Sequence, residues 1–280
     1  MHTTSFQLAV YQQGNGEAKN LALVLPGLLD TKDYPNMKAH VDFLASKGFY
    51  AISFDPPGTW QSSEDIHEYT MTNYLAAIDE LIAQQGNKPT LLVGHSLGGL
   101  IATLAAAKSP HVTAFVAIMS PASLVREENG ELRAVGRTLE QWEQDGTRPS
   151  DRDLPEDSTK TKHFELPFSF AEDAQKYSSL EGLKNLTKPK LFIAGKADTK
   201  ITPVMVNTTF DAAAEPKQYV EIESDHDYRR SPELIEEVND VIGQFLEKHK
   251  DDSLGNFTEV VRVMANTPPI SNKDLKRRKN

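Results

Sequence analysis

The feature that most constrains the fold of this chain is the stretch from Thr90 to Lys108, where a G-x-S-x-G pentapeptide joins two apolar segments. Thr90-Leu-Leu-Val93 is a compact apolar run typical of a buried strand, and Leu97 to Lys108 is rich in alanine and leucine, as in a helix. Within Gly94-His-Ser-Leu-Gly98, the serine is expected at the tip of a sharp strand-to-helix turn, in a strained backbone conformation. Side chains two positions before and after this serine would collide with the turn, so both positions require glycine. The start of the helix would place free N–H groups and its positive dipole beside Ser96, where an oxyanion could form.

A simpler interpretation is that Gly94 and Gly98 only close a tight connection and that Ser96 is a helix N-cap. Serine is common at N-caps, and the bare pentapeptide pattern recurs by chance. The flanking strand and helix favour a catalytic serine, provided that the chain supplies a base and an acid elsewhere.

Apolar runs alternate with amphipathic segments through most of the chain. The expected strands are Phe6–Tyr11, Leu21–Leu25, Phe49–Phe54, Thr90–Val93, Val112–Met119, Pro189–Ala194 and Gln218–Ile222. The expected helices are Asn36–Lys47, Tyr69–Gln84, Leu97–Lys108, Pro203–Ala214 and Pro232–Lys248. Strands that alternate with helices over short loops indicate βαβ units, so we predict an α/β fold with a mainly parallel sheet.

The alternation stops after residue 121 and resumes at residue 188, which suggests three parts. Residues 1–121 and 188–250 would form the core, and the polar, irregular residues 122–187 would form an inserted cap with some helix. Residues 251–280 would be a C-terminal extension. In it, Phe257 to Met264 alternates like an extra strand, and Asn266 to Asn280 is expected to be a loose tail.

Composition excludes several classes of protein. The 280 residues include 30 basic and 40 acidic side chains, a net charge of −10, which argues against nucleic acid or an anionic membrane as the main partner. The chain has no cysteine, which excludes disulfides, a thiol nucleophile and cysteine metal sites. We recognise neither a signal peptide nor a long apolar span, so a cytoplasmic location without a membrane span is expected. The oligomeric state stays open, a homo-oligomer included.

A serine hydroxyl needs a neighbouring base, and the base needs a carboxylate to orient it. In an open α/β sheet, these groups lie on loops at the carboxyl ends of strands. Asp198 follows the strand that ends at Ala194, and His226 follows the strand that ends at Ile222. The chain order of Ser96, Asp198 and His226 is the order expected for a nucleophile elbow of this kind.

Each of these residues has a simpler interpretation. Asp198 could be a turn or capping aspartate, and His226 a surface histidine in an acidic loop. Asp225 and Asp227 are rival acids, but adjacent residues are poorly placed to brace the ring of His226. The other late histidine, His249, lies among lysines at a helix end, where we expect it to be solvated.

The oxyanion of an acyl-transfer intermediate would need two N–H donors. The first is expected to be the backbone N–H of Leu97, which directly follows the nucleophile. The second would come from the loop Pro26-Gly-Leu-Leu-Asp30, with the N–H of Leu28 as the predicted donor. An ordinary Pro-Gly turn is the alternative for this loop.

These residues together resemble the α/β-hydrolase superfamily, within its serine esterase, monoacylglycerol-lipase-like and serine-aminopeptidase-like branch. The similarity extends from Leu21 to Lys248 and includes Asp55-Pro-Pro-Gly-Thr59, which is similar to the family's D-x-P-G-x-G-x-S loop. The resemblance implies a mostly parallel, eight-stranded sheet with a cap between strands six and seven. Two positions depart from the family pattern, because Pro26 replaces a common histidine and Trp60 or Gln61 replaces a glycine.

The sequence therefore predicts a serine hydrolase that cleaves small-molecule carboxylic esters through an acyl-enzyme, with no cofactor and no metal. An acyltransferase or a carbon–carbon bond hydrolase could use the same residues, and a non-catalytic ligand-binding protein is the alternative from another class. Apolar cap residues, such as Trp142 and the run Leu166 to Phe170, would either line an acyl pocket or pin the cap to the core.

Overall fold

The central element of the protein is a sheet of seven strands. A computed structural model describes residues 1–62 and 65–250. The strands of this sheet are β1 (Val10–Gln13), β2 (Leu21–Leu25), β3 (Tyr50–Phe54), β4 (Thr90–His95), β5 (Val112–Ile118), β11 (Lys190–Gly195) and β12 (Lys217–Ile222). Their order is β1-β3-β2-β4-β5-β11-β12, in which β1 is antiparallel to β3 and all other pairs are parallel.

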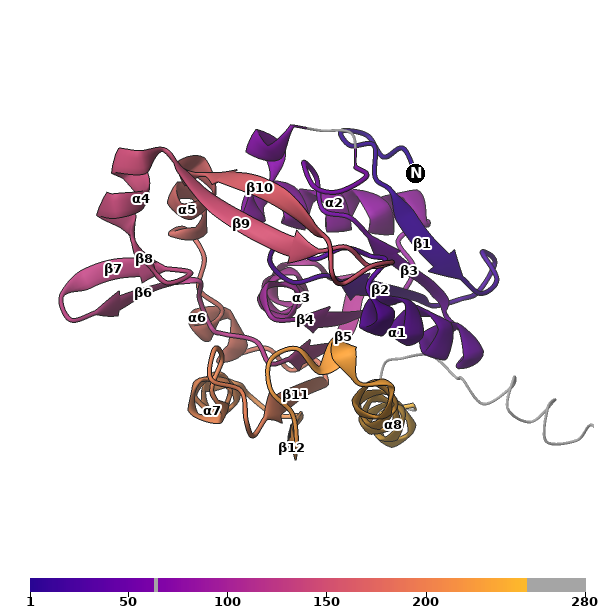
Figure 1. Cartoon of the computed structure of the whole chain (residues 1–280). Helices are drawn as coiled ribbons and strands as arrows, with labels where there is room; N and C mark the ends of the chain where they lie inside the picture. The colour runs from indigo at the N-terminus through magenta and orange to yellow at the C-terminus, as the bar shows by residue number, and fades with distance from the viewer. Residues whose placement is uncertain (63–64, 251–280) are drawn as a thin grey trace, which may run out of the picture.

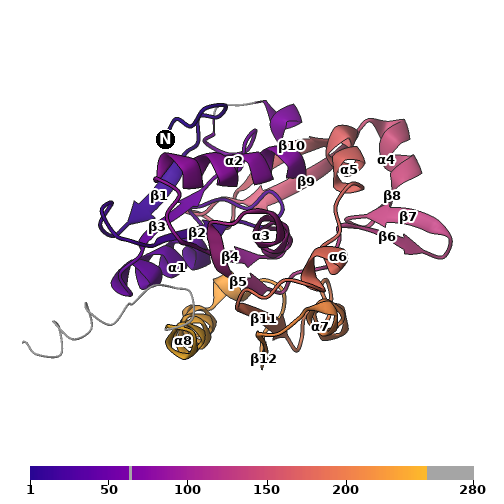
Figure 2. The same ribbon diagram turned by 180° about the vertical axis from the view of Figure 1, so that it is seen from behind.

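Helices cover both faces of this sheet (Figures 1 and 2). They are α1 (Pro35–Ser46), α2 (Met71–Gln84), α3 (Leu97–Lys108), α7 (Pro203–Ala212) and α8 (Pro232–Lys248). Along β2, Leu21, Leu23 and Leu25 join one apolar cluster with α2 and α3, whereas Ala22 and Val24 join a second cluster with α1 and α8. Side chains of a strand alternate between its two faces, so one continuous apolar run supplies both layers of the core.

The chain leaves the sheet after β5 and returns at β11. The intervening segment contains β6 (Val125–Glu128), β7 (Glu131–Ala134), β8 (Arg137–Thr138), α4 (Leu139–Asp145), β9 (Thr147–Asp153), β10 (Thr161–Pro167), α5 (Phe168–Ala174) and α6 (Leu180–Leu183). Figure 1 shows the β6–β7 hairpin pointing away from the sheet and the long β9–β10 hairpin running back over it. Two short 3₁₀ helices, Ile66–Glu68 and Tyr228–Arg230, complete the described elements.

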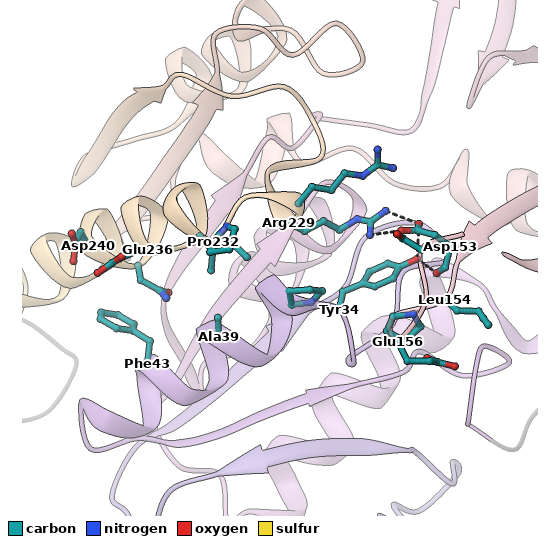
Figure 3. Close-up of a pocket in the computed structure, with 16 residues that line it drawn as sticks. Tyr34, Ala39, Phe43, Asp153, Leu154, Glu156, Arg229, Pro232, Glu236 and Asp240 are labelled. Carbon is teal, nitrogen blue, oxygen red and sulfur yellow. Dashed lines mark hydrogen bonds and ion pairs between the residues drawn. The ribbon is translucent and has the colours of Figure 1, made fainter. Parts of the chain in front are cut away.

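An ion pair fastens the end of β9 to the core (Figure 3). The two terminal nitrogens of the Arg229 guanidinium, Nη1 and Nη2, donate to the carboxylate of Asp153 over 2.8 and 2.7 Å. The hydroxyl of Tyr34 donates to the Asp153 carbonyl over 2.8 Å. This pairing lowers the pKa of Asp153 to about 2. These residues line a groove between α1, α8 and the loop after β9, in which none of Ser96, Asp198 and His226 takes part.

The α/β fold class and the mostly parallel sheet are confirmed, with several differences in detail. The described sheet has seven strands, one fewer than the resemblance implies. Strand β1 begins at Val10, whereas Gln7 forms an isolated bridge with His2. The insertion contains strands that the irregular pattern did not suggest. Residues 257–264, the predicted extra strand, and the predicted tail after them lie outside the described residues.

Candidate active site

The backbone at Ser96 has the strained turn that the pentapeptide predicts. Its φ of 53° and ψ of −119° lie outside the helical region, although Leu97 already belongs to α3. A Cβ atom at Gly94 would lie closer than 3.0 Å to the Gly98 carbonyl, and one at Gly98 would lie closer than 3.0 Å to the carbonyls of Leu25 and Pro26. Real Cβ atoms essentially never make such approaches, so the turn can form only with glycine at these positions.

The structure brings Ser96, His226 and Asp198 together at the carboxyl ends of β4, β12 and β11. The Nε2 atom of His226 lies 3.1 Å from the Ser96 hydroxyl, and its Nδ1 atom lies 2.7 Å from the Asp198 carboxylate. Ring nitrogen Nδ1 must carry the proton to donate to that carboxylate, which leaves Nε2 free to accept from the serine. The three residues, which are far apart in the sequence, therefore form one hydrogen-bonded chain.

Asp198 is held in place by the backbone of its own loop. Its Oδ1 atom accepts hydrogen bonds from the N–H groups of Lys200 and Ile201, over 2.8 and 2.9 Å. Burial by itself raises the pKa of this carboxyl, but the hydrogen bonds from His226 and from these two amides outweigh it and lower the pKa below its ordinary value. Asp198 is therefore ionised at neutral pH and available to orient the imidazole.

The rival acids are engaged elsewhere. The Asp227 carboxylate pairs with Lys200 at 3.3 Å and with Arg229 at 3.8 Å, while Asp225 accepts a hydrogen bond from the backbone of Asp227. His249 is not solvated as expected, since it is only 6% exposed and its ring packs on Phe245. The last turn of α8 folds it against the core, so neighbouring lysines are a poor guide to its burial.

The two predicted oxyanion donors are placed as follows. Leu28 lines the same cavity as Ser96, and Leu97 is the first residue of α3. Within residues 1–62 and 65–250, neither backbone N–H has a hydrogen-bond partner. Both amides are therefore free to donate to a bound group.

Three aromatic side chains hold the loop that carries Leu28. The Tyr74 hydroxyl donates to the Pro26 carbonyl over 3.1 Å, the Tyr69 hydroxyl accepts from the Leu29 N–H over 3.1 Å, and the Trp60 indole donates to the Leu29 carbonyl over 2.8 Å. Leu29 itself has a positive φ of 55°. A strained residue of this kind persists only where its surroundings over-determine it, which these contacts do.

Of Trp60 and Gln61, either of which could replace the glycine that the resemblance implies, Trp60 is the one with a positive φ. Its φ is 46°, so the backbone keeps a left-handed conformation that favours glycine. Edge contacts with the rings of Tyr34 and Phe164 hold the indole in place. The departure from the family pattern therefore preserves the turn and adds a hydrogen bond to the Leu29 loop. No periodicity or motif in the sequence points to this role.

His95 is a second residue that sequence reasoning missed. Its Nε2 atom lies 3.0 Å from the backbone carbonyl of His226, and the two rings are 4.9 Å apart. Burial lowers the pKa of His95 to about 3, so the ring is neutral at ordinary pH. A carbonyl only accepts, so Nε2 carries the hydrogen and His95 fixes the backbone of the residue that contacts Ser96. Its place beside Ser96 in the pentapeptide was the only signal available.

A cavity of about 630 Å³ opens onto Ser96 and His226. Loops of the core line one side, and the insertion lines the other through β6, β7 and β9. Trp142 is absent from this lining and fully buried, with its indole donating to the Leu166 carbonyl over 3.2 Å. Trp142 therefore lies outside the wall of this cavity, in the apolar cluster that the insertion shares with α2 and α3.

A family model described as alpha/beta hydrolase fold matches residues 22–179, which is more than half of the chain. The chain belongs to the α/β-hydrolase family. The stretch matched begins in β2, includes Ser96 and ends within the insertion.

Solved structures of other proteins share this fold. Est1E from Butyrivibrio proteoclasticus, in a complex with ferulic acid, has a TM-score of 0.68 at 17% identity, covering 88% of this chain and 97% of its own. The monoacylglycerol lipase of Paleococcus ferrophilus has a TM-score of 0.68 at 18% identity, covering 88% and 100%. At these identities the likeness concerns the fold alone.

One curated relative of this chain is the mitochondrial palmitoyl-protein thioesterase ABHD10 of Mus musculus. It is 25% identical over 189 residues, which cover 67% of this chain and 61% of the relative. The solved structure of mouse ABHD10 has a TM-score of 0.66 at 20% identity, covering 89% of this chain and 97% of that one. Among the described residues, no helix has the length and apolar character needed to cross a membrane.

Proposed function

We propose that this α/β-hydrolase is a serine hydrolase that cleaves carboxylic esters. The observation that carries the proposal is the hydrogen-bonded chain from Ser96 through His226 to Asp198, which opens onto a cavity of about 630 Å³. Membership of a hydrolase family supports the general class of reaction.

In the proposed mechanism, Nε2 of His226 takes the proton of Ser96 as the hydroxyl attacks the ester carbonyl. Ionised Asp198 keeps the ring in the required tautomer and stabilises the imidazolium that forms. The N–H groups of Leu28 and Leu97 would hold the tetrahedral oxyanion, and one such donor typically contributes about 10²- to 10³-fold to turnover. His226 then protonates the leaving alcohol and activates the water that releases the acid. The triad supplies both base and acid, so the scheme requires no metal or organic cofactor.

Residues 122–187 would act as the cap of this site. Their strands β6, β7 and β9 contribute one wall of the cavity, which supports a role in substrate selection. The substrate is expected to be a small molecule, and the cytoplasmic location stays a prediction. Acyl thioesters belong in the same test, because a curated relative carries the name palmitoyl-protein thioesterase.

The test is labelling of the whole chain with a fluorophosphonate probe, in parallel with the Ser96→Ala variant, followed by esters and thioesters of graded acyl length. We expect Ser96-dependent labelling and hydrolysis that the alanine variant loses by several orders of magnitude. An unlabelled wild type, or an alanine variant that retains full hydrolysis, would contradict the proposal. Adding alcohol acceptors distinguishes an acyltransferase, and a diketone panel distinguishes a carbon–carbon bond hydrolase.

A further inference from the structure

The cavity at Ser96 contains more basic than acidic side chains, although the whole chain has a net charge of −10. The basic residues of its lining are Arg126, Arg133, Arg148, Arg152 and Lys200. All four arginines come from residues 122–187. The positive charge is therefore concentrated on the wall that faces the serine from the insertion.

Two of these five cations form ion pairs with acidic residues of the same lining. Arg152 forms an ion pair with Asp30, the last residue of the loop that carries Leu28. Lys200 pairs with Asp227 at 3.3 Å. The third acid of the lining, Asp151, lies 2.8 Å from the ring of His163.

Two more cations have acidic partners near the solvent. On the β6–β7 hairpin, Arg126 lies 3.8 Å and Arg133 lies 3.5 Å from the carboxylate of Glu128. Arg133 also lies 3.3 Å from Glu131. These side chains are partly or largely exposed, so water and salt screen their charges.

Arg148 differs from the other four. It is half-buried on β9, and its guanidinium donates to the hydroxyl of Ser150 on the same strand face. In the part of the chain that the structure describes, no carboxylate pairs with it. Burial lowers the pKa of this guanidinium, and the positive charge of Arg137 lowers it further. A partly desolvated cation without a counter-charge is unfavourable, and an anion bound in the cavity would relieve that cost.

The rest of the lining indicates what such an anion would be attached to. Apolar side chains line the cavity between the catalytic loops and the insertion; they are Leu28, Leu124, Val135, Ile201 and Met205. A guanidinium offers a planar fork of donors that matches a carboxylate in two parallel hydrogen bonds. One carboxylate balances one uncompensated positive charge, whereas a phosphate, at about −1.5 to −2, would leave negative charge in excess.

We propose that Arg148 is a specificity residue, which binds a carboxylate carried by an ester substrate while Ser96 attacks the ester carbonyl. The preferred substrate then has an apolar middle and an anionic end. This inference rests on the proposed esterase activity and adds the substrate class to it.

Two pairs of esters that differ in one charge test this inference. The 4-nitrophenyl esters of glutarate and pentanoate place the carboxylate, or a methyl group, on the acyl side. The butyrate esters of 4-hydroxybenzoate and 4-hydroxybenzamide place the charged or neutral group on the leaving side. The ratio of kcat/KM within each pair is measured for the wild type and for the Arg148→Gln, Arg148→Lys and Arg126→Gln variants at low ionic strength.

We expect the wild type to prefer the anionic member of at least one pair by about tenfold or more, the scale of a hydrogen-bonded charge pair. Arg148→Gln should bring that ratio close to one, Arg148→Lys should retain part of it, and Arg126→Gln should keep most of it. Equal rates within both pairs would overturn the inference, as would a preference that survives Arg148→Gln. A ratio that Arg126→Gln lowers as far as Arg148→Gln would indicate a diffuse field and would also overturn it.

Binding separates this inference from the proposed function. Calorimetric titration of the Ser96→Ala protein with monoethyl glutarate and with ethyl pentanoate requires no turnover. Tighter binding of the anion that Arg148→Gln abolishes would support the carboxylate site even if no ester were cleaved. Equal binding of the two ligands would refute it. Neutral esters that are cleaved without a charge preference would leave the proposed function intact and remove only the role of Arg148.

Discussion

The indole nitrogen of Trp60 donates a hydrogen bond of 2.8 Å to the carbonyl oxygen of Leu29, the residue next to the predicted oxyanion donor Leu28. Trp60 also accepts a hydrogen bond at its own carbonyl from Lys162 of β10, over 3.0 Å. Through its backbone and its side chain together, Trp60 therefore joins the insertion to the loop on which oxyanion stabilisation is expected to depend. Rigid support of this kind matters because a donor is effective only when it is aimed before the reaction begins.

Trp60→Phe is expected to lower kcat about threefold to tenfold with little change in KM. The variant keeps an aromatic ring against Tyr34 and Phe164 but loses one hydrogen bond, which is worth about 1 kcal/mol. Steady-state kinetics on a neutral ester measure the effect. Trp142→Phe is the matched control, because it removes an indole hydrogen bond to Leu166 inside the insertion, and kcat should stay within about twofold. Equal losses of kcat in the two variants would argue against a positioning role for Trp60.

Asp198→Asn is expected to reduce kcat by about 10⁴-fold while substrate binding is largely retained, because the amide favours the wrong tautomer of His226. Asp225→Asn removes a neighbouring carboxylate that does not contact the ring, and kcat should change by less than about threefold. Burst and steady-state measurements on an activated ester compare the two variants. Similar losses of kcat in both would mean that Asp198 is not the orienting acid.

Gly98→Ala is expected to destabilise the fold by about 2 kcal/mol or more. The new methyl group would press on the carbonyls of Leu25 and Pro26, which are backbone atoms that cannot rotate away. Gly16→Ala is the control, since no heavy atom lies within 4 Å of the added Cβ and φ there is not positive. Urea unfolding of both variants gives the free energies. A Gly98→Ala protein as stable as Gly16→Ala would contradict the packing of the elbow.

Stability is expected to fall as the pH is lowered from about 6.5 to 4. Burial lowers the pKa of His40 to about 4, from an ordinary value of 6.5. Between these two pH values, His40 is therefore protonated in the unfolded chain but neutral in the native state. The contribution of neutral His40 to the unfolding free energy is fully present above about pH 6.5. Below that pH, a buried neutral histidine of this kind lowers the unfolding free energy by up to about 1.4 kcal/mol per pH unit.

His40→Gln should remove about one proton from this linkage. Urea unfolding of the variant and the wild type across the same pH range measures the two slopes. His95, whose pKa burial lowers to about 3, should maintain part of the slope in the variant. Identical slopes would mean that His40 is protonated in the native state.

Much of the architecture could be predicted because local signals agree with the fold. The apolar run Leu21–Leu25 became β2, and the amphipathic pattern from Pro232 to Lys248 became α8 with the same bounds. The candidate triad residues could be proposed from a motif, a chain order and two strand ends. These signals are local in sequence, which is why a single sequence contains them.

Other features depend on contacts between distant residues. Strand β9 has the sequence Thr147-Arg-Pro-Ser-Asp-Arg-Asp153, in which apolar and polar residues do not alternate. It pairs with β10 in a two-stranded hairpin that is separate from the main sheet. Its polar side chains form ion pairs with residues of the core, such as Asp30 and Arg229, and do not pack in an apolar cluster. The roles of Trp60 and His95 likewise depend on backbone carbonyls more than 30 residues away. No pattern along the chain encodes such pairings.

The contacts that attach β9 and β10 to the core have a consequence for engineering of this protein. Arg152 joins Asp30, Lys162 joins the backbone of Trp60, and Asp153 joins Arg229 three residues after His226. A hairpin grafted from another hydrolase would bring new recognition surface but would lose these three attachments. The hairpin therefore cannot be exchanged by itself. Chimeras should recover activity only when the core residues that contact the new hairpin are transferred together with it.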